Sequence, residues 1–179
     1  MPIAERYRPH YTYEEYCQWE GNWELIEGMP YAMSPMPVPA HQRVSLTLSY
    51  RFDVALKDCK NCTVYPPLDW KIGEDTVVQP DILIVCKPVT KSFLDFPPVL
   101  VVEILSPSTA SKDRNEKMEI YQSQQVKYYL IVDAKFKKIE IYQFIDGKYT
   151  LVANTPVTYL FDFGDAGCTA DVNLSSIWA

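Results

Sequence analysis

The chain has 179 residues, 47% of them hydrophobic and 22% charged, which are ordinary proportions for a globular protein. No apolar run approaches the roughly 20 residues of a membrane-spanning helix, which argues against a membrane protein. The net charge of −6 argues against broad electrostatic binding to nucleic acid, so any such contact would depend on a local basic patch.

A chain of this length can bury one core, and we expect a single domain over residues 1–179. Residues 1–16 are polar and aromatic, without the apolar segment of a signal peptide, so we expect a cytoplasmic protein. Five cysteines, an odd number, fit a reduced compartment better than a disulfide framework. Cys59 and Cys62 form a CxxC pair. A zinc site would need a second pair or histidines to complete it; the alternative is two cysteines in a helix-to-strand loop.

The N-terminal part predicts a short helix followed by a hairpin. Residues 12–19 begin with Thr12 and carry Glu15 three positions later, which is capping-box spacing. Residues 23–33 read as a hairpin that turns at Glu27 and Gly28. Glu24 in its first strand is either a third acid near a functional site or a cross-strand partner for a surface lysine.

A long amphipathic helix is predicted over residues 41–57. The prolines in residues 34–39 favour an extended connector before it. Val44, Leu48 and Phe52 recur at helical spacing, so one face should pack on a sheet. His41 lies in the first turn, where a packing or capping role competes with a functional one.

Two apolar runs, residues 81–85 and 99–105, each carry one carboxylate. Both runs are rich in β-branched residues and bounded by prolines, so both predict buried strands. Burying Asp81 or Glu103 in such a strand is costly unless the charge is paired or binds a metal. Either each acid pairs with a lysine or arginine, or the two lie on adjacent strands and share a hard cation.

The next predicted helix carries a lysine close to these strands. Asp113 and Glu116 have capping-box spacing, with Asp113 as the expected N-cap. Asp113, Lys117 and Tyr121 follow each other every four residues and therefore share a helical face. Two buried acids and a lysine from an adjoining element are typical of metal-assisted phosphodiester hydrolysis, in which the lysine stabilises negative charge or orients water.

The remaining segments predict more sheet. Residues 62–72 should form a strand at an edge or with a bulge, because Pro66 and Pro67 interrupt it. Residues 127–133 should lie parallel to the Glu103 strand, after a right-handed crossover. Residues 139–152 alternate as a half-exposed meander. From Thr155 the chain reads as loop-rich, with apolar residues that pack on the domain or on a dimer partner.

Several motifs occur in the order found in one protein family. The chain contains, in sequence, Glu24-Leu-Ile-Glu-Gly28, His41, Pro80-Asp81, Glu103-Ile-Leu-Ser-Pro-Ser-Thr109, Asp113…Lys117…Tyr121 and Tyr129-Leu-Ile-Val-Asp133. This set resembles a large bacterial family of restriction-endonuclease-like proteins, formerly a domain of unknown function, within the PD-(D/E)xK nuclease superfamily. The resemblance covers about residues 10–145. The usual lysine position, two residues after the second acid, is Leu105 here, and Lys117 would replace it.

The resemblance implies an α/β fold, with a restriction-endonuclease-like mixed sheet flanked by helices and a nuclease core at about residues 20–145. It implies a metal-dependent endonuclease acting on DNA, and a homodimer. Asp81, Glu103 and the Ile104 carbonyl would hold Mg²⁺ or Mn²⁺. Lys117 would polarise water or phosphate, Glu24 would assist, and Tyr121 would orient Lys117.

Two other function classes compete with this prediction. One is a non-catalytic module that retains the nuclease scaffold for binding or regulation, favoured by the acidic net charge and the displaced lysine. The other is a metal-dependent hydrolase of a different substrate. The direction of Lys117, toward the two carboxylates or into solvent, distinguishes the catalytic from the non-catalytic alternative.

Overall fold

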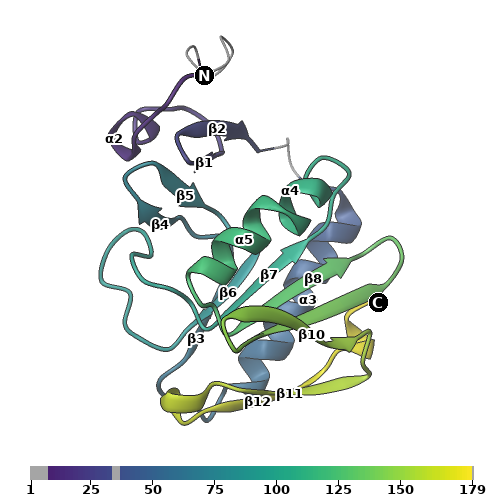
Figure 1. Cartoon of the computed structure of the whole chain (residues 1–179). Helices are drawn as coiled ribbons and strands as arrows, with labels where there is room; N and C mark the ends of the chain where they lie inside the picture. Colours follow the sequence, from purple (N-terminus) through teal and green to yellow (C-terminus); the bar gives the residue numbers. More distant parts are fainter. Residues whose placement is uncertain (1–7, 34–36, 179) are drawn as a thin grey trace.

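A computed structural model describes residues 8–33 and 37–178, and a six-stranded mixed sheet lies at its centre (Figure 1). The strand order is β10-β9-β8-β7-β6-β3, and only β7 and β8 run parallel. The strands are β3 (Thr63–Tyr65), β6 (Ile82–Val85), β7 (Leu100–Ile104), β8 (Tyr128–Asp133), β9 (Lys138–Ile145) and β10 (Lys148–Asn154). The predicted parallel crossover and meander are confirmed. The strand predicted over residues 62–72 is divided: Thr63–Tyr65 forms the edge of this sheet, and Trp70–Gly73 belongs to a second sheet, because Pro66 and Pro67 interrupt the run.

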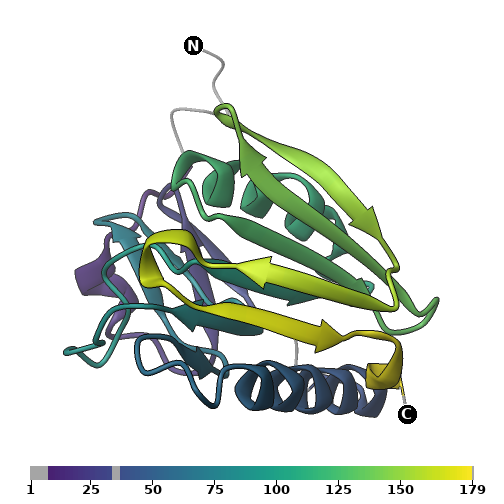
Figure 2. The same cartoon turned by 90° about the horizontal axis from the view of Figure 1, so that it is seen from below.

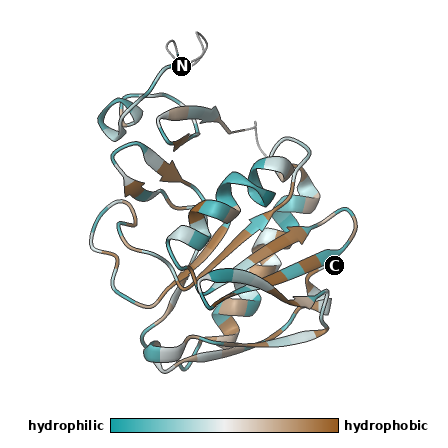
Figure 3. Ribbon diagram, in the orientation of Figure 1, coloured by the Kyte–Doolittle hydropathy of each residue, from teal (hydrophilic) through white to brown (hydrophobic). Residues whose placement is uncertain are grey.

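Helices cover both faces of this sheet (Figure 2). The long helix α3 (Pro39–Ala55) lies on one face, and α4 (Ala110–Arg114) and α5 (Glu116–Ser123) lie on the other. Because side chains alternate along a strand, Val102 of β7 packs in the core on the α3 side, whereas Val101 packs with Tyr121 of α5. The central strands are correspondingly the most hydrophobic ribbons in Figure 3.

A second, four-stranded antiparallel sheet carries the N-terminal part of the chain. Its order is β2-β1-β5-β4, from β1 (Trp23–Ile26), β2 (Met29–Ala32), β4 (Trp70–Gly73) and β5 (Thr76–Val78). The short helix α2 (Tyr13–Tyr16) precedes it, with Thr12 and Glu15 forming the predicted capping box. Glu27 and Gly28 both adopt positive φ at the predicted β1–β2 turn.

Three features differ from the sequence prediction: the start of α3, the role of Asp113 and the structure after Thr155. Helix α3 begins at Pro39, because proline is well suited to the first helical position; residues 34–36 of the predicted connector lie outside the described residues. Asp113 is not an N-cap: it lies inside α4, and no side-chain cap begins α5. The segment after Thr155 is a hairpin of β11 (Thr158–Asp162) and β12 (Thr169–Asn173), with short 3₁₀ turns at Gly164–Ala166 and Ser175–Trp178.

The C-terminal hairpin packs within its own chain. Phe161, Phe163 and Ile177 are buried in the core on the α3 side of the sheet. Of the two expectations for these residues, packing on the domain is therefore the one observed. No helix among the described residues is both long and apolar enough to cross a membrane.

The cysteines differ from the expectation of a reduced chain. Disulfides join Cys59 to Cys168 and Cys62 to Cys86, and among the described cysteines only the exposed Cys17 is unpaired. An odd total says nothing about which cysteines meet in space, which is why counting was misleading here. Cys59 and Cys62 do lie in the loop between α3 and β3, as predicted.

Candidate active site

Asp81 and Glu103 lie on neighbouring strands at one end of the sheet. Asp81 directly precedes β6, and Glu103 lies in β7, which pairs with β6 through Ile82 and Val102. The Ile104 backbone N–H donates to Asp81 Oδ2 at 2.7 Å. Both acids line a small cavity of about 80 Å³, together with Ile104, Lys117 and residues of α4.

Lys117 of α5 points inward at the acids. Its Nζ lies 2.8 Å from Glu103 Oε1 and 2.7 Å from Glu24 Oε1, and its side chain is only 3% exposed. Tyr121, one turn later, donates its hydroxyl to the same Glu103 oxygen at 2.5 Å. Tyr121 was expected to orient Lys117, but its hydrogen bond holds Glu103 instead.

Glu24 belongs to this cluster and is not a surface cross-strand partner. It is completely buried in β1, and its Oε1 also accepts the Gln79 backbone N–H at 2.8 Å. Lys112 of α4 reaches its other oxygen at 2.5 Å. Lys112 was not among the predicted site residues, although its place beside Asp113 in the motif segment was an available signal.

Asp113, like Lys112, belongs to this cluster although the sequence did not predict it there. It is 1% exposed, and its Oδ1 lies 3.8 Å from Lys117 Nζ. Neither carboxylate oxygen has a hydrogen-bond partner in the described part of the chain. Its four-residue spacing from Lys117 placed both residues on one helical face. The capping-box spacing of Asp113 and Glu116, however, suggested that Asp113 was the N-cap.

The site contains more negative than positive charge. Four carboxylates, those of Glu24, Asp81, Glu103 and Asp113, face the two ammonium groups of Lys112 and Lys117 and the imidazole of His41. With every acid ionised, this leaves two negative charges, or one when His41 is protonated. Burial raises the pKa of Glu103 well above its usual range; Lys117 opposes this, and the neighbouring acids reinforce it. Burial also raises the pKa of Asp113. The cluster therefore favours an added cation.

Glu24 differs from Glu103 and Asp113, because two lysines hold its pKa below the usual value. Burial alone would raise the pKa of Glu24, but Lys117 and Lys112 hold it below the usual value. Burial alone would lower the pKa of Lys117, but Glu103, Glu24 and Asp113 raise it, so Lys117 stays protonated. Lys117 is thus a fixed positive charge and not a proton acceptor at neutral pH.

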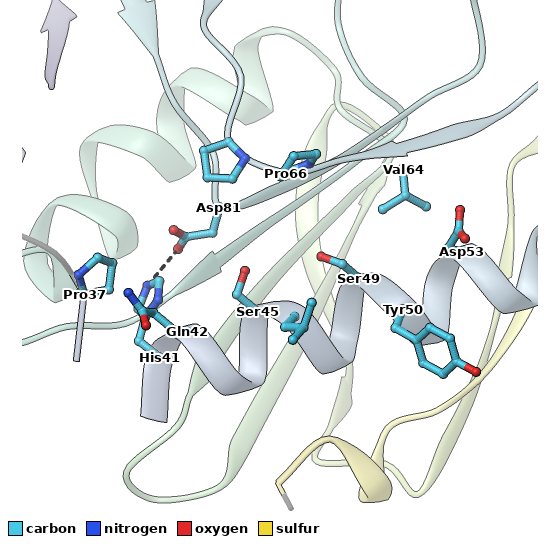
Figure 4. Close-up of a pocket in the computed structure, with 12 residues that line it drawn as sticks. Pro37, His41, Gln42, Ser45, Ser49, Tyr50, Asp53, Val64, Pro66 and Asp81 are labelled. Carbon is cyan, nitrogen blue, oxygen red and sulfur yellow. Dashed lines mark ion pairs between the residues drawn. The ribbon is translucent and has the colours of Figure 1, made fainter. Parts of the chain in front are cut away.

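An open groove of about 500 Å³ leads to Asp81 (Figure 4). His41 of α3 is 3.3 Å from Asp81 Oδ2; burial lowers the pKa of His41, but Asp81 and the Ile104 backbone outweigh this and raise it. Gln42, Ser45 and Ser49 follow along the same helix and line the groove. Hydroxyl and amide groups of this kind commonly contact phosphate oxygens.

A crystal structure of another protein has a similar fold. The chain is similar to the crystal structure of a putative nuclease of the DUF820 family from Anabaena variabilis, with a TM-score of 0.72 and 15% identity over 93% of this chain and 97% of that one. The predicted α/β class, a restriction-endonuclease-like mixed sheet flanked by helices, is confirmed.

Sequence comparison identifies the family. Residues 12–161 match the Uma2 family, described as "Putative restriction endonuclease", and the chain belongs to it. A relative from Synechocystis sp., the uncharacterized protein slr1290, is 32% identical over 156 residues, which cover 82% of this chain and 80% of the relative. The family supports a function of the nuclease type.

The sequence motifs led us to expect a divalent metal, and the buried oxygens test whether one fits. Asp113 has two buried carboxylate oxygens without a hydrogen-bond donor among the described residues, and it lines the same cavity as Asp81 and Glu103. Unpaired buried carboxylate oxygens are costly, and hard cations bind such ligands. The donor set therefore fits Mg²⁺ or Mn²⁺.

Proposed function

We propose that this protein is a divalent-cation-dependent endonuclease that hydrolyses phosphodiester bonds in DNA. The observation that carries the proposal is the direction of Lys117, whose ammonium group is buried among the carboxylates and does not extend into solvent. That direction is the one expected of an active enzyme and not of a non-catalytic scaffold.

Asp81, Glu103 and the Ile104 carbonyl would hold the cation, and Asp113 is an added ligand candidate. A bound divalent cation supplies Lewis-acid activation of water and neutralises charge at the phosphate. Asp81 is the acid best placed to meet a substrate, because it lines both the small cavity and the open groove.

The protein's own groups have separate tasks in this proposal. Lys117, permanently charged, stabilises negative charge that develops on the phosphate. Tyr121 and Lys117 fix one oxygen of Glu103 and so orient the carboxylate. Glu24 takes no part in binding the cation here; it positions Lys112 and Lys117.

DNA would lie along the groove beside α3. Ser45, Ser49 and Gln42 offer contacts to successive phosphates, and His41, whose pKa Asp81 raises, adds a positive charge there when it is protonated. These local contacts would serve in place of the broad basic surface that the acidic chain lacks. We also propose that the protein is a homodimer, because Leu46, Tyr50 and Val54 leave an exposed apolar stripe on α3. Leu46 and Tyr50 also line the groove, so the partner chain would border the DNA and form one side of its binding surface.

Cation binding and DNA nicking, measured on the same samples, test this function. Magnesium and manganese are titrated calorimetrically into the wild type and into Asp81→Ala, Asp113→Asn and Lys117→Met, and nicking of a supercoiled plasmid is then measured. Asp81→Ala should lose both properties. Lys117→Met should lose nicking by about 100-fold or more, since it removes the charge that stabilises the phosphate. It should retain cation binding, because Tyr121 still holds the Glu103 carboxylate.

Glu119→Gln is the matched control, because Glu119 is an exposed acid on the same helix as Lys117. It should behave as the wild type, and circular dichroism establishes that each variant is folded. A wild type that binds the cation without nicking DNA would redirect the search to other substrates of a metal-dependent hydrolase. A wild type that does neither would favour the non-catalytic binding module.

A further inference from the structure

Four cysteines from distant parts of the chain meet at one point on the sheet edge opposite the candidate active site. Cys59 and Cys62 lie in the loop after α3, Cys86 follows β6, and Cys168 precedes β12. The Sγ atoms of Cys59, Cys62 and Cys168 all lie within 4.8 Å of one another, and Cys62 is bonded to Cys86. Two disulfides that served only as separate cross-links would not need to touch.

The tertiary structure brings the CxxC pair the two further cysteines that a zinc site requires. Cys59 and Cys62 have the two-residue spacing of zinc-ligand pairs, and Cys86 and Cys168 complete a set of four. Four thiolates around Zn²⁺ at about 2.3 Å from the metal are about 3.8 Å apart. Three of the sulfurs here lie within 4.8 Å of one another, and the fourth, that of Cys86, is one S–S bond from Cys62, so only side-chain movements separate the four from that arrangement.

The surroundings hold the four sulfurs in place and suit their charge. Asn61, inside the CxxC loop, donates to the Ala166 carbonyl at 3.1 Å and so ties this loop to the β11–β12 turn that carries Cys168. Lys60 and Lys87 line the surface hollow beside Cys86, together with Asp165. A zinc tetrathiolate carries two net negative charges, which the two lysines offset.

We propose that, once a thiol or phosphine reductant has opened the two disulfides with four electrons and four protons, Cys59, Cys62, Cys86 and Cys168 bind one structural Zn²⁺ and release their four thiol protons. The site is separate from the candidate active site, because Cys86 and Asp81 lie at opposite ends of β6, about 16 Å apart along an extended strand. All four positions are filled by protein sulfur, so the ion would be structural and would attach the C-terminal hairpin to the sheet.

Metal content tests the proposal directly. The wild-type chain is purified in a phosphine reductant without chelator and analysed by elemental mass spectrometry, and zinc release is followed while a mercurial titrates the thiols. We expect one zinc per chain, released as four thiols react. Cys17→Ser, which removes the exposed unpaired thiol, and Asp81→Ala should both retain the zinc, which separates this ion from the active-site cation.

Cobalt provides a second measurement that does not depend on variants that fold poorly. Co²⁺ added to the reduced wild type should give the intense thiolate-to-cobalt charge-transfer absorption of a four-thiolate site, and Cys59→Ser with Cys168→Ser should lose it. A reduced, folded wild type without zinc and without this absorption would overturn the proposal. Persistence of both disulfides under the reductant would overturn it as well.

Discussion

The ionisation of each buried acid in the site depends on the groups that contact it. Glu24 is ionised because two lysines contact it, whereas burial raises the pKa of Glu103, which shares its one lysine with Glu24 and Asp113. Asp113 has no hydrogen-bond donor among the described residues. Of the two ideas for a buried acid in a core strand, the ion pair with lysine is therefore observed in this cluster, and the shared cation is a proposal.

The raised pKa of Glu103 predicts how stability varies with pH. Because burial puts the folded pKa above the unfolded value of about 4.3, the stability linked to this group is present at lower pH and is lost as pH rises through the folded pKa. We expect Glu103→Gln to lose less Tm than the wild type as pH rises from about 4 to 7 without divalent cation.

Comparing the wild type with Glu103→Gln isolates the contribution of Glu103 to the pH dependence of Tm. Glu24 has the opposite pH dependence and Asp113 the same one, but both are present in the wild type and in the variant. Differential scanning fluorimetry across that pH range measures the two profiles. Parallel profiles would show that Glu103 does not carry a raised pKa.

At the level of elements, strand alternation brings the site together. Odd-numbered residues of β7 face α5, so Glu103 meets Lys117 and Tyr121, while its even-numbered neighbours pack toward α3. Helix α3 is held by its buried stripe and presents His41 and the serines to the groove. The same helix thus supports the core and forms the wall of the groove.

The packing of α3 gives a stability prediction. Phe52 is fully buried against Phe161 of the C-terminal hairpin, with ring centroids 5.3 Å apart. Phe52→Ala should lower the free energy of unfolding by about 3–5 kcal/mol, measured by urea denaturation. Phe136→Ala, the same substitution at a residue that is 63% exposed, should change it by no more than about 0.5 kcal/mol. Equal effects would place Phe52 outside the core.

For the whole molecule, the acidic charge and the exposed stripe on α3 matter most. The net charge of −6 gives no long-range attraction to DNA, so association should be slow and should depend on local contacts in the groove. The stripe of Leu46, Tyr50 and Val54 is exposed in the single chain.

The proposed homodimer predicts a particle of about twice the chain mass of 20.7 kDa. Light scattering coupled to size-exclusion chromatography measures that mass. Val54→Glu should shift the mass toward one chain, because it places a charge in the apolar stripe, whereas Glu119→Gln on the other face of the sheet should not. A wild type that elutes as a single chain at micromolar concentration would contradict the dimer.

The sequence by itself determined the strand that follows Asp81, the strand that carries Glu103, the parallel crossover, the helix that carries Lys117 and the family resemblance. These follow from local patterns, namely apolar runs, helical spacing and motif order, which a linear chain displays directly. Tertiary structure alone decided the burial of Asp113, the pairing of Lys112 with Glu24 and the meeting of four cysteines. Those contacts join residues up to 109 positions apart, and their energies depend on the shared surroundings, which no local pattern records.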